Sequence, residues 1–120
     1  MRKLAMFTVL FVAMGQCGLA HCFFFELGTL GGPDSLARGI NDACEVVGKS
    51  YTASWDYHAF LWLPEPAYGL PAGMNDLWTL GGVDSYAYGI NDACQVVGYS
   101  LTASGDEHAF LWLPDPAYNI

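Results

Sequence analysis

Two histidines each follow an aspartate by two positions, in Asp56-x-His58 and Asp106-x-His108. On an extended strand this spacing brings both side chains to one face, where a carboxylate can orient an imidazole for metal binding or general-base catalysis. The alternative is a histidine at the entrance of a strand, hydrogen-bonded to a loop. Because the pair recurs in both halves of the chain, we favour this structural role, since duplicated folding elements are commoner than duplicated catalytic centres.

Calcium is a second candidate ligand. Oxygen ligands for calcium are available on Asp34, Asn41 and Asp42, and on their counterparts Asp84, Asn91 and Asp92. These residues lack the dense acidic spacing of calcium loops, and Asn and Asp in turns more often bond their own backbone. The sequence also contains no Cys-x-x-Cys pair, nucleophile elbow, phosphate loop or dinucleotide fingerprint. We therefore predict no catalytic residue, metal or cofactor, and we do not expect an enzyme.

The four cysteines are Cys17, Cys22, Cys44 and Cys94. In an oxidising compartment a disulfide is chemically feasible, and Cys44 and Cys94 occupy equivalent turns. A bridge requires Cα atoms within about 7 Å, and equivalent turns of neighbouring repeats usually lie further apart. We expect free or intermolecular thiols, with a Cys44–Cys94 bridge as the alternative.

The chain has 120 residues and a formal net charge of −8, from 4 Lys+Arg against 12 Asp+Glu. Binding a phosphate backbone requires clustered Lys and Arg, so nucleic acid is excluded as a partner. With 53% hydrophobic and 13% charged residues, the chain is too apolar for an intrinsically disordered protein. The length allows one modest domain.

Residues 1–20 have the three parts of a secretory signal peptide: a basic start, an apolar run over residues 4–14, and small residues ending at Ala20. We predict a signal helix cleaved after Ala20 and a secreted or cell-surface bacterial protein. The mature form should have no transmembrane span, since a membrane helix needs about 17–25 apolar residues. The alternatives are a buried helix, an uncleaved anchor extended through Phe23–Phe25, and a lipoprotein acylated at Cys22.

The rest of the chain consists of two tandem copies of one sequence repeat. Residues 27–70 and 77–120, aligned at an offset of 50, agree at 32 of 44 positions. Identity over a whole unit indicates duplication. We therefore divide the chain into a signal peptide (1–20), a first repeat (21–74) and a second repeat (75–120).

Within each repeat, turn residues alternate with segments that favour β-branched and aromatic side chains. In the first repeat we predict four strands, Phe25–Leu30, Ala37–Asn41, Glu45–Tyr51 and His58–Leu63. We predict four more at the equivalent positions fifty residues later. Alternation gives the last strand two apolar faces, as in a sheet covered on both sides. The fold class predicted is all-β, with two tandem four-stranded antiparallel units that look like β-propeller blades.

Several motifs follow one another in a fixed order: Leu-Gly-Thr-Leu-Gly-Gly, Ser-x-Ala-x-Gly-Ile-Asn-Asp, Val-Val-Gly-x-Ser and His-Ala-Phe-Leu-Trp. They resemble the HAF family of extracellular repeats, which is named for the tripeptide found here at residues 58–60 and 108–110. The resemblance implies exported bacterial proteins of tandem, propeller-like units, with no established activity to carry over. The family usually has Gly where this chain has Cys44 and Cys94. Gly suits a turn with positive φ, which Cys adopts at a cost of about 1 kcal/mol.

Two blades cannot close a ring that typically takes about 4–8, so two large apolar faces remain uncovered. We expect a non-enzymatic structural or binding module whose partners are copies of itself or other blade-containing chains. Binding of a protein or a glycan is the alternative kind of partnership. Two further functions stay open: a metal-assisted hydrolase or lyase using the Asp-x-His pairs, and a truncated fragment without an independent role.

The candidate residues fall into two groups. The aromatic residues that differ between the repeats or lie at their joint are the ligand-binding candidates: Tyr51, Trp55, Trp78, Tyr86, Tyr88 and Tyr99. The shared residues of the repeat motif are predicted to be structural: His58, Phe60, Trp62, His108, Phe110 and Trp112.

Overall fold

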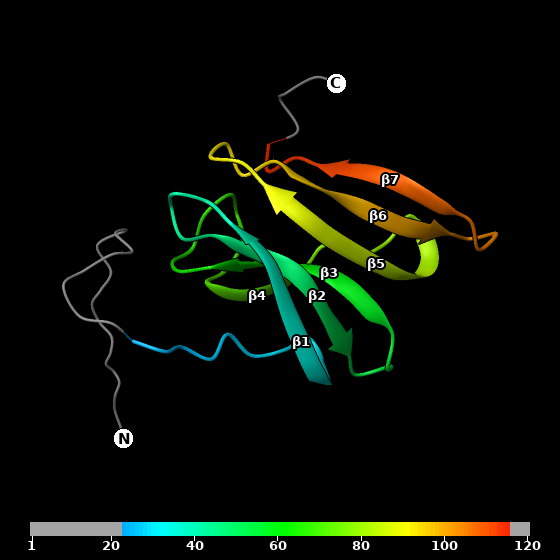
Figure 1. Ribbon diagram of the computed structural model, residues 1–120, viewed down its shortest axis with the longest axis horizontal. Helices are drawn as coiled ribbons and strands as arrows, with labels where there is room; N and C mark the ends of the chain where they lie inside the picture. Colours follow the sequence, from blue (N-terminus) through cyan, green and yellow to red (C-terminus); the bar gives the residue numbers. More distant parts are fainter. Residues whose placement is uncertain (1–22, 116–120) are drawn as a thin grey trace.

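The computed structural model describes residues 23–115 as seven strands in two antiparallel sheets. The first sheet has the order β1 (Gly31–Ile40), β2 (Val46–Thr52), β3 (Tyr57–Leu63) and β4 (Gly73–Asp76). The second has the order β5 (Gly81–Ile90), β6 (Val96–Thr102) and β7 (Glu107–Trp112). The two sheets lie one on the other as successive layers (Figure 1).

The described part of the chain is all-β and contains no helix, so none of its segments is a helix that could cross a membrane. The predicted signal helix, the cleavage site after Ala20, and Cys22 lie outside the described residues.

The hairpin of β2 and β3 forms where the sequence predicts it, within one residue of the expected bounds. The strands pair in the register Val47↔Leu61 and Lys49↔Ala59 without a bulge. One face of β3, formed by Ala59, Leu61 and Leu63, is fully buried. The alternation of apolar residues therefore sets which side of the hairpin enters the core.

The first strand of each sheet is longer than expected, because β1 begins at Gly31 rather than at Ala37. Register shifts between Gly31 and Ser35 and between Ala37 and Gly39 let it run through a segment that reads as a turn. Gly48 lies opposite this irregular stretch, and a Cβ there would overlap the carbonyl oxygen of Leu36. The glycine of Val-Val-Gly is thus required by the close approach of β1.

The prediction of four strands per repeat is wrong in its assignment of strands. Phe25–Leu30 is not a strand, and its one bridge to the sheet is Leu30 with Thr52. The fourth strand of the first sheet is instead β4, which pairs with β3 and which the predicted boundary divides equally between the two repeats. The boundary at residue 74 therefore falls inside β4. The second sheet has three strands in the described part of the chain.

A single core holds the two layers together. Val47, Ala59, Leu61 and Leu63 of the first sheet pack in one cluster with three residues of the second repeat: Ala87, Cys94 and Val96. Strand β5 makes the joint, because its Ser85 is 1% exposed and its Oγ accepts a hydrogen bond from the Ala59 N–H at 2.8 Å. The repeats are therefore packed layers of one domain.

The turn between the first two strands of each sheet has a positive φ, which glycine favours, at 62° for Cys44 and 59° for Cys94. Cys44 is disulfide-bonded, whereas Cys94 is a buried free thiol. The two cysteines are therefore not bridged to each other. The expectation of free or intermolecular thiols is confirmed for Cys94 and is wrong for Cys44, and the alternative of a Cys44–Cys94 bridge is wrong.

Candidate functional site

The first Asp-x-His pair does not form. His58 lies on β3, and its Nδ1 is 2.9 Å from both carboxylate oxygens of Asp76 on β4, so the partner of the imidazole is Asp76 and not Asp56. Asp76 also accepts a hydrogen bond from the backbone N–H of Trp78 at 2.7 Å. The centroid of the Trp78 indole lies 5.8 Å from that of the His58 imidazole. His58 therefore ties β3, β4 and the start of the second repeat together.

The second pair does not form either. Asp106 accepts a hydrogen bond from Ser104 Oγ at 3.2 Å, and His108 is exposed on β7. Within residues 23–115 the His108 side chain has no hydrogen-bond or ion-pair partner. The carboxylate that orients His58 is on the fourth strand of its sheet, which the second sheet lacks in the described part of the chain.

The aromatic residues of the repeat motif lie on the face of their strand that carries the histidine. In the first sheet Phe60 is 1% exposed and Trp62 is half-buried. In the second sheet Phe110 and Trp112 are both half-buried and pack against the core. The shared motif is therefore a packing motif, with less cover in the second sheet.

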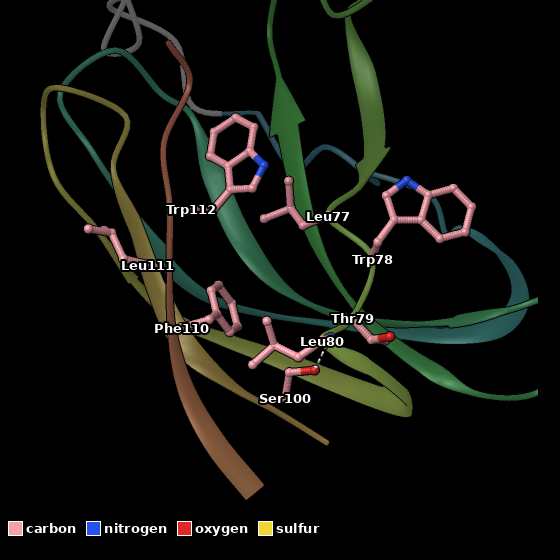
Figure 2. A pocket seen from close by; sticks show the side chains of 8 residues that line it. All are labelled: Leu77, Trp78, Thr79, Leu80, Ser100, Phe110, Leu111 and Trp112. Carbon is pink, nitrogen blue, oxygen red and sulfur yellow. Dashed lines mark hydrogen bonds between the residues drawn. The ribbon is translucent and has the colours of Figure 1, made fainter. Parts of the chain in front are cut away.

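Phe110 and Trp112 line a pocket beside β7, which we call the β7 pocket (Figure 2). Figure 2 shows both side chains pointing toward Leu77 and Leu80, while Leu111 points away on the opposite face of the strand. The cavity measures about 110 Å³, well below the roughly 300–1,000 Å³ of sites for drug-sized ligands. A single apolar side chain matches it better than a substrate does.

Five of the six candidate binding aromatics lie in one row across both sheets. Successive ring centroids are 3.9–5.9 Å apart, in the order Trp55, Tyr51, Tyr57, Tyr86, Tyr99 and Tyr88. The sixth candidate, Trp78, is not in this row and contacts His58 instead. Burial, followed by the charge of Asp84, raises the pKa of Tyr86 to about 12, so this phenol stays neutral.

Tyr57 and Lys49, which were not among the residues predicted from the sequence, occupy the centre of the row. The Lys49 ammonium lies 4.1 Å from the centroid of Tyr57 and 5.2 Å from that of Tyr86. Such cation–π contacts join β2 and β3 of the first sheet to β5 of the second. Tyr57 differs between the repeats, with Glu107 as its counterpart. The criterion that selected the other aromatics would therefore have selected it too.

The largest difference between the two repeats is in the exposure of equivalent side chains. Val47 and Leu61 are each 0% exposed, whereas their counterparts Val97 and Leu111 are 50% and 47% exposed. The residue types are identical, so the difference is that the second sheet covers this face of the first sheet. The same face of the second sheet, which we call the open face (Val97, Ala109 and Leu111), remains exposed.

The residues considered for calcium form turn contacts instead. Asn41 Oδ1 accepts hydrogen bonds from the N–H groups of Ala43 and Glu45, which is the backbone bonding expected of Asn in a turn. The Asp42 N–H donates to Asp92 Oδ1 at 2.9 Å, across the joint of the repeats. The neighbouring Asp92 carboxyl raises the pKa of Asp42 by hydrogen bonding and charge repulsion. In residues 23–115 no group of three or more His, Cys, Asp and Glu side chains is arranged to hold a metal ion.

A buried polar cluster lies at the same joint. Glu45 is 5% exposed, and its carboxylate accepts hydrogen bonds from Asn41 Nδ2 at 2.6 Å and Tyr68 Oη at 2.8 Å. Burial, followed by the charge of Glu45, raises the pKa of Cys94 to about 12. A thiol held protonated in this way is a poor nucleophile. The cluster therefore stabilises the joint rather than supplying reactive groups.

Comparison of the chain with models of known families, with curated proteins and with solved structures finds no match to any of them. The function must therefore be argued from the geometry of the chain itself.

Proposed function

We propose that this chain is an exported, non-enzymatic structural repeat protein whose two blade-like units are built to stack on further units of the same kind. In this account its partners are other copies of the chain, or other chains that contain the same repeat. The resemblance to HAF repeats supports the assignment as an exported, propeller-like protein.

The observation that carries this proposal is the contrast between the covered and the open face. Leu61 is fully buried under the second sheet, while the identical residue Leu111 is about half exposed. Val47, Ala59 and Leu61 recur as Val97, Ala109 and Leu111, so this apolar part of the open face fits the side of a blade that already packs against its equivalent. Contacts of this kind are heterologous, and they build rings or open stacks.

The opposite end of the domain shows the complementary surface. Ala87 of β5 is 1% exposed where it meets the first sheet, while its counterpart Ala37 on β1 is exposed. The first sheet thus presents to solvent the side of β1 that its counterpart β5 uses in the joint. One copy offers a covering surface, and the next offers a surface to be covered.

The test is the mass of the purified chain by light scattering after size exclusion, over a range of concentrations. We expect masses at whole multiples of the chain, rising with concentration. The mass of one chain at every concentration up to the solubility limit would overturn the proposal. The variant Leu111→Asp should remain folded and monomeric, because it places a charge on the open face without touching the core.

A second candidate function, recognition of a glycan or protein, is favoured by one observation. Trp55 is 68% exposed and has a φ of 68°, whereas its counterpart in the matching turn is Gly105, with a φ of 89°. A tryptophan in left-handed backbone is strained, and such strain is found mainly at functional positions. If Trp55 binds a glycan, Trp55→Gly should abolish retention of the chain on cellulose, chitin or peptidoglycan and leave its fold intact. Equal retention of the variant and the wild type would reject this role.

A further inference from the structure

Strand β4 comes from the stretch of chain that leads into the second repeat. Its residues Gly73–Asp76 pair antiparallel with β3, with Met74 opposite Trp62. Directly after the strand, the Leu77 N–H donates a hydrogen bond to the Ala59 carbonyl oxygen at 2.9 Å. The first sheet is therefore completed by the segment that joins the duplicated stretches 27–70 and 77–120.

The offset of 50 aligns β4 with Phe23–Glu26, which immediately precedes the duplicated residues 27–70. All three phenylalanines of this segment are more than two-thirds exposed, an unusual amount of uncovered aromatic surface. The segment lies beside the first sheet, and β7 lies on the far side of the molecule (Figure 1). Phe23–Glu26 is therefore a counterpart of β4 that its own chain does not pair with β7.

The outer edge of β7 offers the place that β4 takes on β3. Strand β7 is the last strand of its sheet in the described part of the chain, so no neighbour there pairs with its outer backbone groups. The β7 pocket opens beside this edge and includes Trp112, the counterpart of Trp62. Since Met74 faces Trp62, the offset places Phe24 against Trp112. One aromatic side chain would fill this small apolar pocket.

The charged groups match in the same register. His58 on β3 pairs with Asp76 of β4 at 2.9 Å. The counterpart of His58 is His108, which is exposed, and the counterpart of Asp76 is Glu26. The acid is retained at the end of the Phe23–Glu26 segment, and the imidazole on β7 is without a partner in the described residues.

We propose that Phe23–Glu26 of one copy adds to β7 of a second copy as the fourth strand of its second sheet. Phe24 then enters the β7 pocket, and Glu26 pairs with His108. This inference rests on the proposed function and specifies its contact: the partner is a second copy of this chain, joined by strand addition.

The hydrogen bonds of the internal joint fit the same arrangement. The Ala59 N–H donates to Ser85 Oγ at 2.8 Å on the outer edge of β3. The counterpart of this donor is the Ala109 N–H on the open edge of β7. The counterpart of the acceptor is Ser35, whose Oγ donates to the Gly28 carbonyl at 2.7 Å and keeps its lone pairs for a further contact. One copy thus presents the donor and the next presents the acceptor.

The test compares association constants by sedimentation velocity for the full chain and for variants of the two strands. His108→Glu should weaken association at least about tenfold, because it places like charges opposite each other. Combining it with Glu26→Lys should restore association, since the pair is then reversed. Phe24→Ser should also weaken association about tenfold or more, through loss of one buried aromatic side chain. All these positions are exposed in the single chain, so its unfolding midpoint should not change.

The outcomes separate this inference from the proposed function. If the wild type associates and Leu111→Asp abolishes association, but His108→Glu and Phe24→Ser associate like the wild type, strand addition is wrong and stacking stands. If the wild type does not associate at all, both fail. Failure of the charge-reversed pair to regain association would also overturn the contact between Glu26 and His108.

Discussion

Leu61→Ala and Leu111→Ala, made as separate variants, measure how much stability the first sheet gains because the second sheet buries its face. Leu61 is 0% exposed and Leu111 is 47% exposed, although both lie at the same position of the same heptapeptide. Removing a fully buried leucine side chain costs about 2–5 kcal/mol, because a cavity remains. Removing a half-exposed one leaves no cavity and costs about 1 kcal/mol or less. We therefore expect Leu61→Ala to lose about 2–3 kcal/mol more stability than Leu111→Ala.

The assay is urea denaturation followed by tryptophan fluorescence, at protein concentrations where the chain is a single copy. An unchanged slope of free energy against urea shows that the variants differ in stability and not in the extent of unfolding. At higher concentration the loss for Leu111→Ala should increase, because association covers the open face. Equal losses for both variants at low concentration would refute the packing of the second sheet on this face.

Three further predictions follow from the joint and the turns. Trp55→Gly should raise the free energy of unfolding by about 1 kcal/mol in thermal melts, because it relieves a positive φ, and Gly105→Trp should lower it by a similar amount. Changes of the same sign would contradict backbone strain at Trp55. Cys94 should resist alkylation by iodoacetamide at pH 8 until the chain unfolds, because burial raises its pKa to about 12; rapid labelling of the folded chain would show an exposed thiolate. Asp42→Asn should raise the melting temperature at pH 7 and change it less near pH 3. The raised pKa of Asp42 favours the folded state below the ordinary value of 3.8, and this contribution is lost as the pH rises. An equal gain at both pH values would exclude repulsion by Asp92.

The hairpin of each repeat could be predicted from the sequence because its causes are local. Alternating apolar residues define β2 and β3, and the turn residues Cys44 and Cys94 have the positive φ that a glycine would favour. These features depend on side-chain period and turn geometry, which a single repeat contains in full.

The completion of the sheets could not be predicted in this way, because it depends on contacts between distant residues. Asp76 reaches His58 across 18 positions by adding a strand to the preceding repeat, whereas the spacing rule places the nearer Asp56 beside it. Strand β1 passes through Gly-Gly-Pro-Asp by register shifts that a pattern of strands and turns does not reveal. The aromatic row has the same character, since Lys49 and Tyr86 meet only after the two sheets have packed.

Hydrogen exchange of β7 as a function of protein concentration tests the central claim most directly. If further copies cover the second sheet, the amides of Glu107–Trp112 should gain protection as the concentration rises. Those of Tyr57–Leu63, which the chain already covers itself, should be protected at every concentration. Exchange of β7 that is fast and independent of concentration, up to the solubility limit, would contradict the account.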